Sequence, residues 1–116
     1  MKRITMLAVV ATAGAALAAN AGAATPKLTG SVSDPLNISL TAGGKKVTSL
    51  KAGRYTIVVK DTASDHNFHL TGPGVNKTTS VAGKGTFTWK VALKKGTYRF
   101  VCDPHKSFMK GSFTVK

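Results

Sequence analysis

Short runs in which apolar and polar residues alternate recur along the chain, and they restrict its fold more than any other feature. In the run 55–59 every second residue is apolar, and the run 87–93 repeats this pattern. No helical period of comparable length exists. Glycine-containing turn clusters, such as 71–74 and 82–85, separate the runs. Period-two alternation between turns predicts half-buried strands, and the spacing predicts seven to eight of them in an antiparallel sandwich.

Two segments of the sequence read Leu-Lys-x-Gly-x-Tyr, at 50–55 and at 93–98, each just before a predicted strand. Six residues are too few to define a repeat. The second segment resembles the tyrosine corner of Greek-key sandwiches, in which a Tyr hydroxyl bonds back to the backbone near the start of a late strand. Its role is therefore structural, and it supports an all-β Greek-key β-sandwich.

The first 23 residues do not resemble the rest of the chain. Lys2 and Arg3 form a basic start, 4–19 is apolar and rich in alanine, and 21–23 offers small residues for cleavage. These 16 apolar residues are fewer than the roughly 20 that a membrane-spanning helix needs. We therefore expect a signal peptide at 1–23 before a single domain at 24–116, and export to the periplasm or the extracellular space. A retained membrane anchor is the alternative.

The net charge of the domain is strongly positive. The chain has 17 Lys and Arg against 4 Asp and no Glu, so removal of Lys2 and Arg3 leaves a net charge of +11. Such a charge favours nucleic acid, an anionic membrane or an acidic protein as partner. The lysines are scattered, without a basic arm or recognition helix, and export argues against nucleic acid. We expect an acidic redox protein as partner, a monomeric domain, and no stable membrane insertion after signal cleavage.

Cys102 is the only cysteine of the chain, although exported proteins usually pair their cysteines as disulfides. An inert buried thiol, an intermolecular disulfide and a metal-bound thiolate are the possible explanations. Strand alternation places Tyr98, Phe100 and Cys102 on one face, so that the thiol points inward at the end of its strand. The neighbours of Cys102 favour the metal.

Pro104 favours an extended residue before it and lacks an amide hydrogen, so the chain leaves the sheet here and folds back. This turn brings His105 and Met109 within reach of the Cys102 sulfur. Thiolate, imidazole and thioether form a soft donor set that suits copper. A blue copper site also needs a second histidine, which must come from elsewhere in the chain.

Two histidines in the segment 65–70 could supply the missing ligand. If Phe68 and Leu70 point into the core, alternation places His66 on their side and His69 on the opposite, solvent face. We therefore expect His66 to be the ligand and His69 to be an exposed strand histidine.

Together these residues resemble the plastocyanin and azurin group of blue copper proteins, the cupredoxins, over about 24–116. The resemblance is carried by His66-Asn67, the Tyr-x-Phe-x-Cys strand at 98–102, and Cys102-x2-His105-x3-Met109. It implies one type 1 copper ion with His66, Cys102 and His105 as equatorial ligands and Met109 as the axial one. It also implies that Asn67 ties the two ligand loops together by hydrogen bonding near the sulfur.

The ligand loop is similar to that of amicyanin, with one more residue between histidine and methionine. Phe108 could not replace Met109 as a ligand. The resemblance implies an electron carrier that cycles between Cu(I) and Cu(II), and the alternative is a copper storage or chaperone protein of the same fold. We do not expect an enzyme. Three histidines are too few for a blue site and a catalytic copper cluster, and a Cys102–His105 nucleophile would lack visible oxyanion donors.

Overall fold

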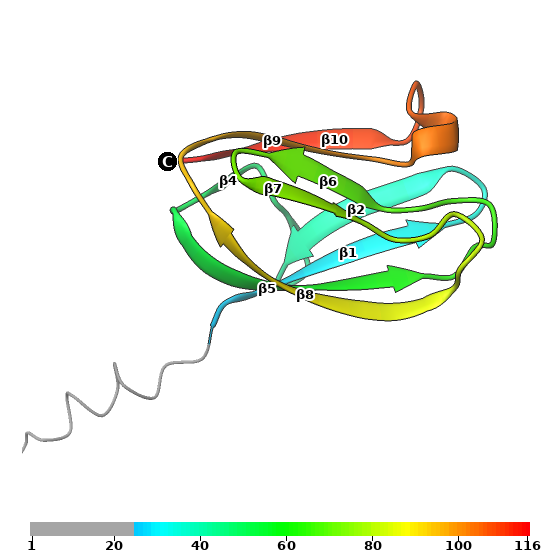
Figure 1. Cartoon of the computed structure of the whole chain (residues 1–116), viewed down its shortest axis with the longest axis horizontal. Helices are drawn as coiled ribbons and strands as arrows, with labels where there is room; N and C mark the ends of the chain where they lie inside the picture. Colours follow the sequence, from blue (N-terminus) through cyan, green and yellow to red (C-terminus); the bar gives the residue numbers. More distant parts are fainter. Residues whose placement is uncertain (1–24) are drawn as a thin grey trace, which may run out of the picture.

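Two β-sheets of five strands each pack face to face in the computed structural model, which describes residues 25–116 (Figure 1). The predicted signal peptide at 1–23 lies outside the described residues. Within the described part of the chain, no helix is long and apolar enough to span a membrane.

The first sheet has the order β3-β2-β1-β5-β8 and the second the order β4-β10-β9-β6-β7. The strands in chain order are β1 (Lys27–Ser33), β2 (Asn37–Ala42), β3 (Lys45–Lys46), β4 (Ser49–Leu50), β5 (Gly53–Asp61), β6 (His69–Gly72), β7 (Val75–Thr78), β8 (Gly85–Leu93), β9 (Gly96–Val101) and β10 (Lys110–Val115), and a 3-10 turn (Asp103–His105) lies between the last two.

Eight of these strands have four to nine residues, and β3 and β4 have two each. The predicted all-β Greek-key sandwich is thus confirmed. Two neighbouring pairs, β1–β5 and β4–β10, nevertheless run parallel. After β3 the chain crosses to β4 in the other sheet before β5 returns to the first, and β5 begins at the same end of the sandwich as β1.

The core lies where the predicted apolar faces of the two sheets meet. On β5 the alternate residues Tyr55, Ile57 and Val59 are buried. In the second sheet Phe68, just before β6, stacks on Phe100 of the neighbouring strand β9, with ring centroids 5.4 Å apart. Alternation therefore predicted the inward direction of these side chains correctly.

Both Leu-Lys-x-Gly-x-Tyr segments use the tyrosine hydroxyl to hold the turn before the strand. The Tyr98 hydroxyl accepts the Lys94 N–H at 2.9 Å and donates to the Pro73 carbonyl at 2.8 Å. The Tyr55 hydroxyl donates to the Lys51 carbonyl at 2.7 Å. The predicted tyrosine corner at Tyr98 is confirmed, and Tyr55 forms a simpler version of it.

The strands give the sandwich two distinct ends. The loops 34–36, 62–68, 79–84 and 102–109 meet at one end, called here the Cys102 end. The other end, called here the basic end, is formed by Lys116 and by the turns β2–β3, β4–β5, β6–β7 and β8–β9. In Figure 1 the 3-10 turn marks the Cys102 end and the C-terminus marks the basic end.

Candidate metal centre

Cys102 follows directly after β9, and its side chain is completely buried. Its backbone N–H donates to the Met109 carbonyl at 3.0 Å, and its carbonyl accepts the His105 N–H at 3.0 Å. The Met109 N–H in turn donates to the His105 carbonyl at 2.8 Å. Backbone hydrogen bonds thus close the loop 102–109 on itself, as the turn at Pro104 predicted.

Three potential metal donors from two distant segments converge beside this loop. The Cys102 Sγ lies 3.6 Å from Nδ1 of His66 and 3.6 Å from Nδ1 of His105, and these two nitrogens are 3.1 Å apart. The point equidistant from the three atoms lies about 2.0 Å from each, which is the length of an imidazole–metal bond. The donor set therefore fits one metal ion in a trigonal arrangement.

The outer nitrogen of His66 is also held. Nε2 of His66 lies 2.8 Å from the Pro35 carbonyl, to which it donates its hydrogen, and 3.2 Å from Oδ1 of Asp34. Oδ1 of Asp65 lies 3.7 Å from the same nitrogen. A hydrogen on Nε2 leaves Nδ1, which faces the sulfur, available as the donor atom. A backbone carbonyl is one of the usual outer partners of a metal-binding histidine.

Met109 is completely buried at the end of the loop, in the same apolar cluster as Cys102. Its position is compatible with the predicted axial role, which stays a prediction. Phe108 is 75% exposed and therefore points away from the core. It lies on the surface, outside the donor set.

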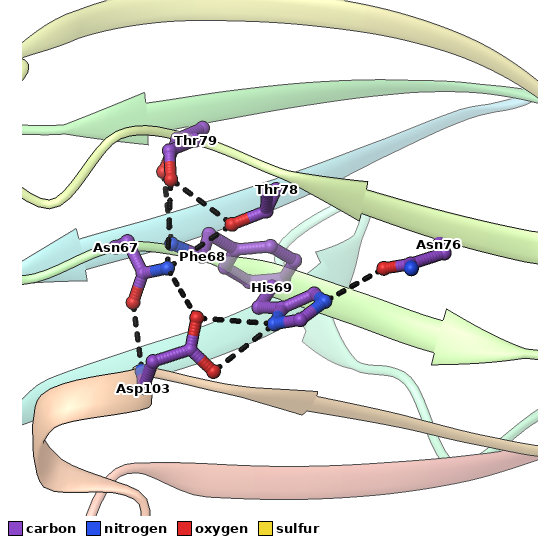
Figure 2. A network of polar contacts seen from close by, with 7 residues as sticks. All are labelled: Asn67, Phe68, His69, Asn76, Thr78, Thr79 and Asp103. Atoms are coloured by element: carbon purple, nitrogen blue, oxygen red, sulfur yellow. Dashed lines mark hydrogen bonds and ion pairs between the residues drawn. The ribbon is translucent and has the colours of Figure 1, made fainter.

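Asn67 joins the two segments that carry the donors (Figure 2). Its Nδ2 donates to Oδ2 of Asp103 at 2.8 Å and to Oγ1 of Thr78 at 3.0 Å, while its Oδ1 accepts the Asp103 N–H at 2.7 Å. Because Asp103 follows Cys102 directly, these bonds fix the cysteine loop relative to the segment of His66. The tie between the loops that the resemblance implied is present.

His69 is less exposed than the sequence analysis expected. It points away from the core, as alternation predicted, but its side chain is only 25% exposed. Nδ1 lies 3.0 Å from Oδ1 of Asp103, and Nε2 lies 2.7 Å from Oδ1 of Asn76 (Figure 2). Sequence reasoning missed this network because Asp103 is 34 residues away along the chain.

The network changes the pKa values of both members of the ion pair. Burial would lower the pKa of His69, but the hydrogen bonds to Asp103 and Asn76 and the charge of Asp103 together outweigh burial and raise it. Burial would raise the pKa of Asp103, but hydrogen bonds from Asn67 and His69, together with the positive charges of His69 and Lys106, outweigh burial and lower it. Both shifts favour a charged His69–Asp103 pair.

Asp61 is a second buried polar residue to which the sequence analysis gave no role. It is 2% exposed at the end of β5, where its Oδ1 accepts the Ala63 N–H at 2.9 Å. Its Oδ2 has no hydrogen-bond partner among the described residues. Burial therefore raises the pKa of Asp61, against the opposing effects of the Ala63 hydrogen bond and of His66.

Comparison with known proteins agrees with the resemblance described from the sequence. The chain matches the family model of the cupredoxin-like domain over residues 4–115. Among curated proteins, no match is found. Auracyanin from Roseiflexus castenholzii, solved in its dithionite-reduced form, is 26% identical with a TM-score of 0.54, and the match covers 82% of this chain and 99% of that one. Rusticyanin from Thiobacillus ferrooxidans is 20% identical with a TM-score of 0.55, over 78% and 76% of the two chains.

Proposed function

Because the chain belongs to the cupredoxin-like family, we propose that it is an exported one-electron carrier that binds one type 1 copper ion. His66, Cys102 and His105 would be its equatorial ligands, and Met109 its axial ligand. The convergence of one sulfur and two imidazole nitrogens around a common point is the observation that carries this proposal. A thiolate with two imidazoles selects copper over hard cations such as magnesium and calcium.

A copper ion in this site would supply the one-electron exchange between its +1 and +2 states. The chain's own residues would keep the site rigid and dry. Cys102 and His66 are buried, the outer nitrogen of His66 is held by Pro35, and Asn67 locks the two loops together. Such a shell limits rearrangement of the ligands when the charge of the site changes.

His105 would be the point at which electrons enter and leave. It is partly exposed, whereas His66 and Cys102 are buried. Phe108 and Leu36, 75% and 46% exposed, lie on loops of the same end and offer apolar contacts to a partner. The net charge of the domain supports an acidic redox partner, whose association should weaken as salt rises.

The proposal is tested by loading the exported protein with Cu(II) and recording its visible absorption and electron spin resonance. We expect an intense thiolate-to-copper band and narrow hyperfine splitting. Cys102→Ser should abolish both, because the band arises from the sulfur. A nearly colourless complex, or a band that persists in Cys102→Ser, would contradict the proposed site.

Electron transfer is tested separately from copper binding. A carrier should show a reversible reduction potential and rapid electron exchange with an acidic redox protein, and should retain its copper during exchange. Facile transfer of copper to another protein, without reversible redox cycling, would instead identify a storage or chaperone protein of the same fold.

A further inference from the structure

The four carboxylate side chains of the chain all lie at the Cys102 end. Asp34 and Asp65 face the outer nitrogen of His66, Asp61 ends β5, and Asp103 follows Cys102. Four lysines lie on the strand ends and loops of the same end, and they are Lys60, Lys84, Lys106 and Lys110. The charges of the Cys102 end are thus close to balanced.

The basic end, in contrast, has cationic side chains and no carboxylate side chain. Eight exposed cations lie there, and they are Lys27, Lys45, Lys46, Lys51, Arg54, Lys94, Lys95 and Lys116. The strand registers place several of them together. Gly53 pairs with Leu93, so the next residues, Arg54 and Lys94, lie near each other. Lys45 pairs with Ala42 in the β2–β3 hairpin, and the Lys116 carbonyl accepts the Ala52 N–H beside Lys51.

The basic end also lacks apolar anchors. The exposed large apolar residues of the described chain are Leu36, Val81 and Phe108, and all three lie on loops of the Cys102 end. Specific protein interfaces depend on a few apolar or aromatic anchors in a dry centre. Cations carried on separate turns suit a partner whose negative charge is itself spread over a surface, as in a bilayer with anionic headgroups.

The basic end is also where the preceding segment of the sequence joins the fold. The Pro26 carbonyl accepts the Thr56 N–H near the start of β5, so the chain enters β1 at this end. The apolar run 4–19 lies shortly before it. A folded domain still joined to this run would have its basic end nearest to the bilayer.

We propose that the basic end docks on anionic phospholipid headgroups and leaves the Cys102 end facing away from the bilayer. The cations would act through long-range attraction rather than insertion, so binding depends on salt. The proposal does not depend on copper binding, because none of the eight cations belongs to the proposed metal site.

Vesicle sedimentation tests the proposal with the protein purified after export, its N-terminus determined by mass spectrometry. The metal-free and copper-loaded forms should both sediment with vesicles in which about a third of the lipid is phosphatidylglycerol, and high salt should release them. Neither form should sediment with pure phosphatidylcholine. Equal binding to neutral vesicles, or no binding to anionic ones, would overturn the proposal.

Two variants with the same loss of charge distinguish the basic end from net charge. The first removes four basic-end cations by Lys45→Gln, Lys46→Gln, Lys94→Gln and Lys95→Gln. The matched control removes the lysines of the Cys102 end by Lys60→Gln, Lys84→Gln, Lys106→Gln and Lys110→Gln.

Each cation near an anionic surface contributes roughly fivefold to binding. The affinity of the first variant for anionic vesicles should therefore fall by on the order of a hundredfold or more, and the affinity of the control should change by less than about threefold. Unchanged circular dichroism verifies that both variants fold. An equal loss of binding in both variants would overturn the proposal. It would also be overturned if the protein bound soluble polyglutamate but not anionic vesicles, because that result would indicate an acidic protein partner.

Discussion

Asn67 and Asp103 hold each other at two points. The Asn67 side chain donates to the Asp103 carboxylate at 2.8 Å and accepts the Asp103 backbone N–H at 2.7 Å. The two residues are 36 positions apart in the chain, and each adjoins a proposed copper ligand. This one side chain therefore links the His66 segment directly to the cysteine loop.

Asn67→Ala should lower the free energy of unfolding of the metal-free protein by about 2 kcal/mol, because it removes several hydrogen bonds made by a buried side chain. Urea denaturation measures this loss. Asn76→Ala, which removes an exposed amide that contacts His69, should cost clearly less. Equal losses would show that the tie between the loops contributes little to stability.

His66 and His69 should respond differently to substitution. His66→Ala removes one of the three convergent donors, so we expect loss of the intense copper band and much weaker copper binding. His69→Ala should keep the band, because its ring nitrogens are bonded to Asp103 and Asn76 instead. Titration of both variants with Cu(II), followed by absorption, measures the difference. Loss of the band in His69→Ala alone would reverse the assignment.

The His69–Asp103 pair should make stability depend on pH. The pKa of His69 is raised from its ordinary 6.5, so its contribution is full below about pH 6.5 and is lost as pH rises through the raised value. The pKa of Asp103 is lowered from 3.8, so its contribution is full above about pH 4 and is lost as pH falls through the lowered value. The pair is therefore strongest between these limits.

We expect His69→Gln to destabilise the metal-free protein most at about pH 5–6 and less at about pH 8. Urea denaturation of both proteins at each pH measures this difference. A difference independent of pH would show that the pair is not ionised in the folded protein.

The two tyrosine hydroxyls provide a graded test of the turns that hold β5 and β9. Tyr98→Phe removes two hydrogen bonds at a fully buried residue and should lower the free energy of unfolding by about 2–3 kcal/mol. Tyr55→Phe removes one and should cost about 1 kcal/mol. Thermal or urea unfolding gives both values, and a larger effect at Tyr55 would contradict the assignment of Tyr98 as the main corner.

Local features of the sequence determined much of this protein. Alternation predicted which side chains point inward, because successive residues of a strand face opposite sides whatever the strand pairs with. The turn at Pro104 brought His105 and Met109 back to Cys102, because only six residues lie between Cys102 and Met109. The ligand assignments and the signal peptide themselves stay predictions.

Only the tertiary structure decided the relationships between distant segments. Alternation is the same for parallel and antiparallel neighbours, so it could not predict that β1 and β5 run parallel. It placed His69 on the outer face, but only the pairing of β6 with β9 brings His69 beside Asp103. The same long-range packing gathers scattered lysines at one end and the four aspartates at the other, because strand register rather than sequence distance determines which residues share an end.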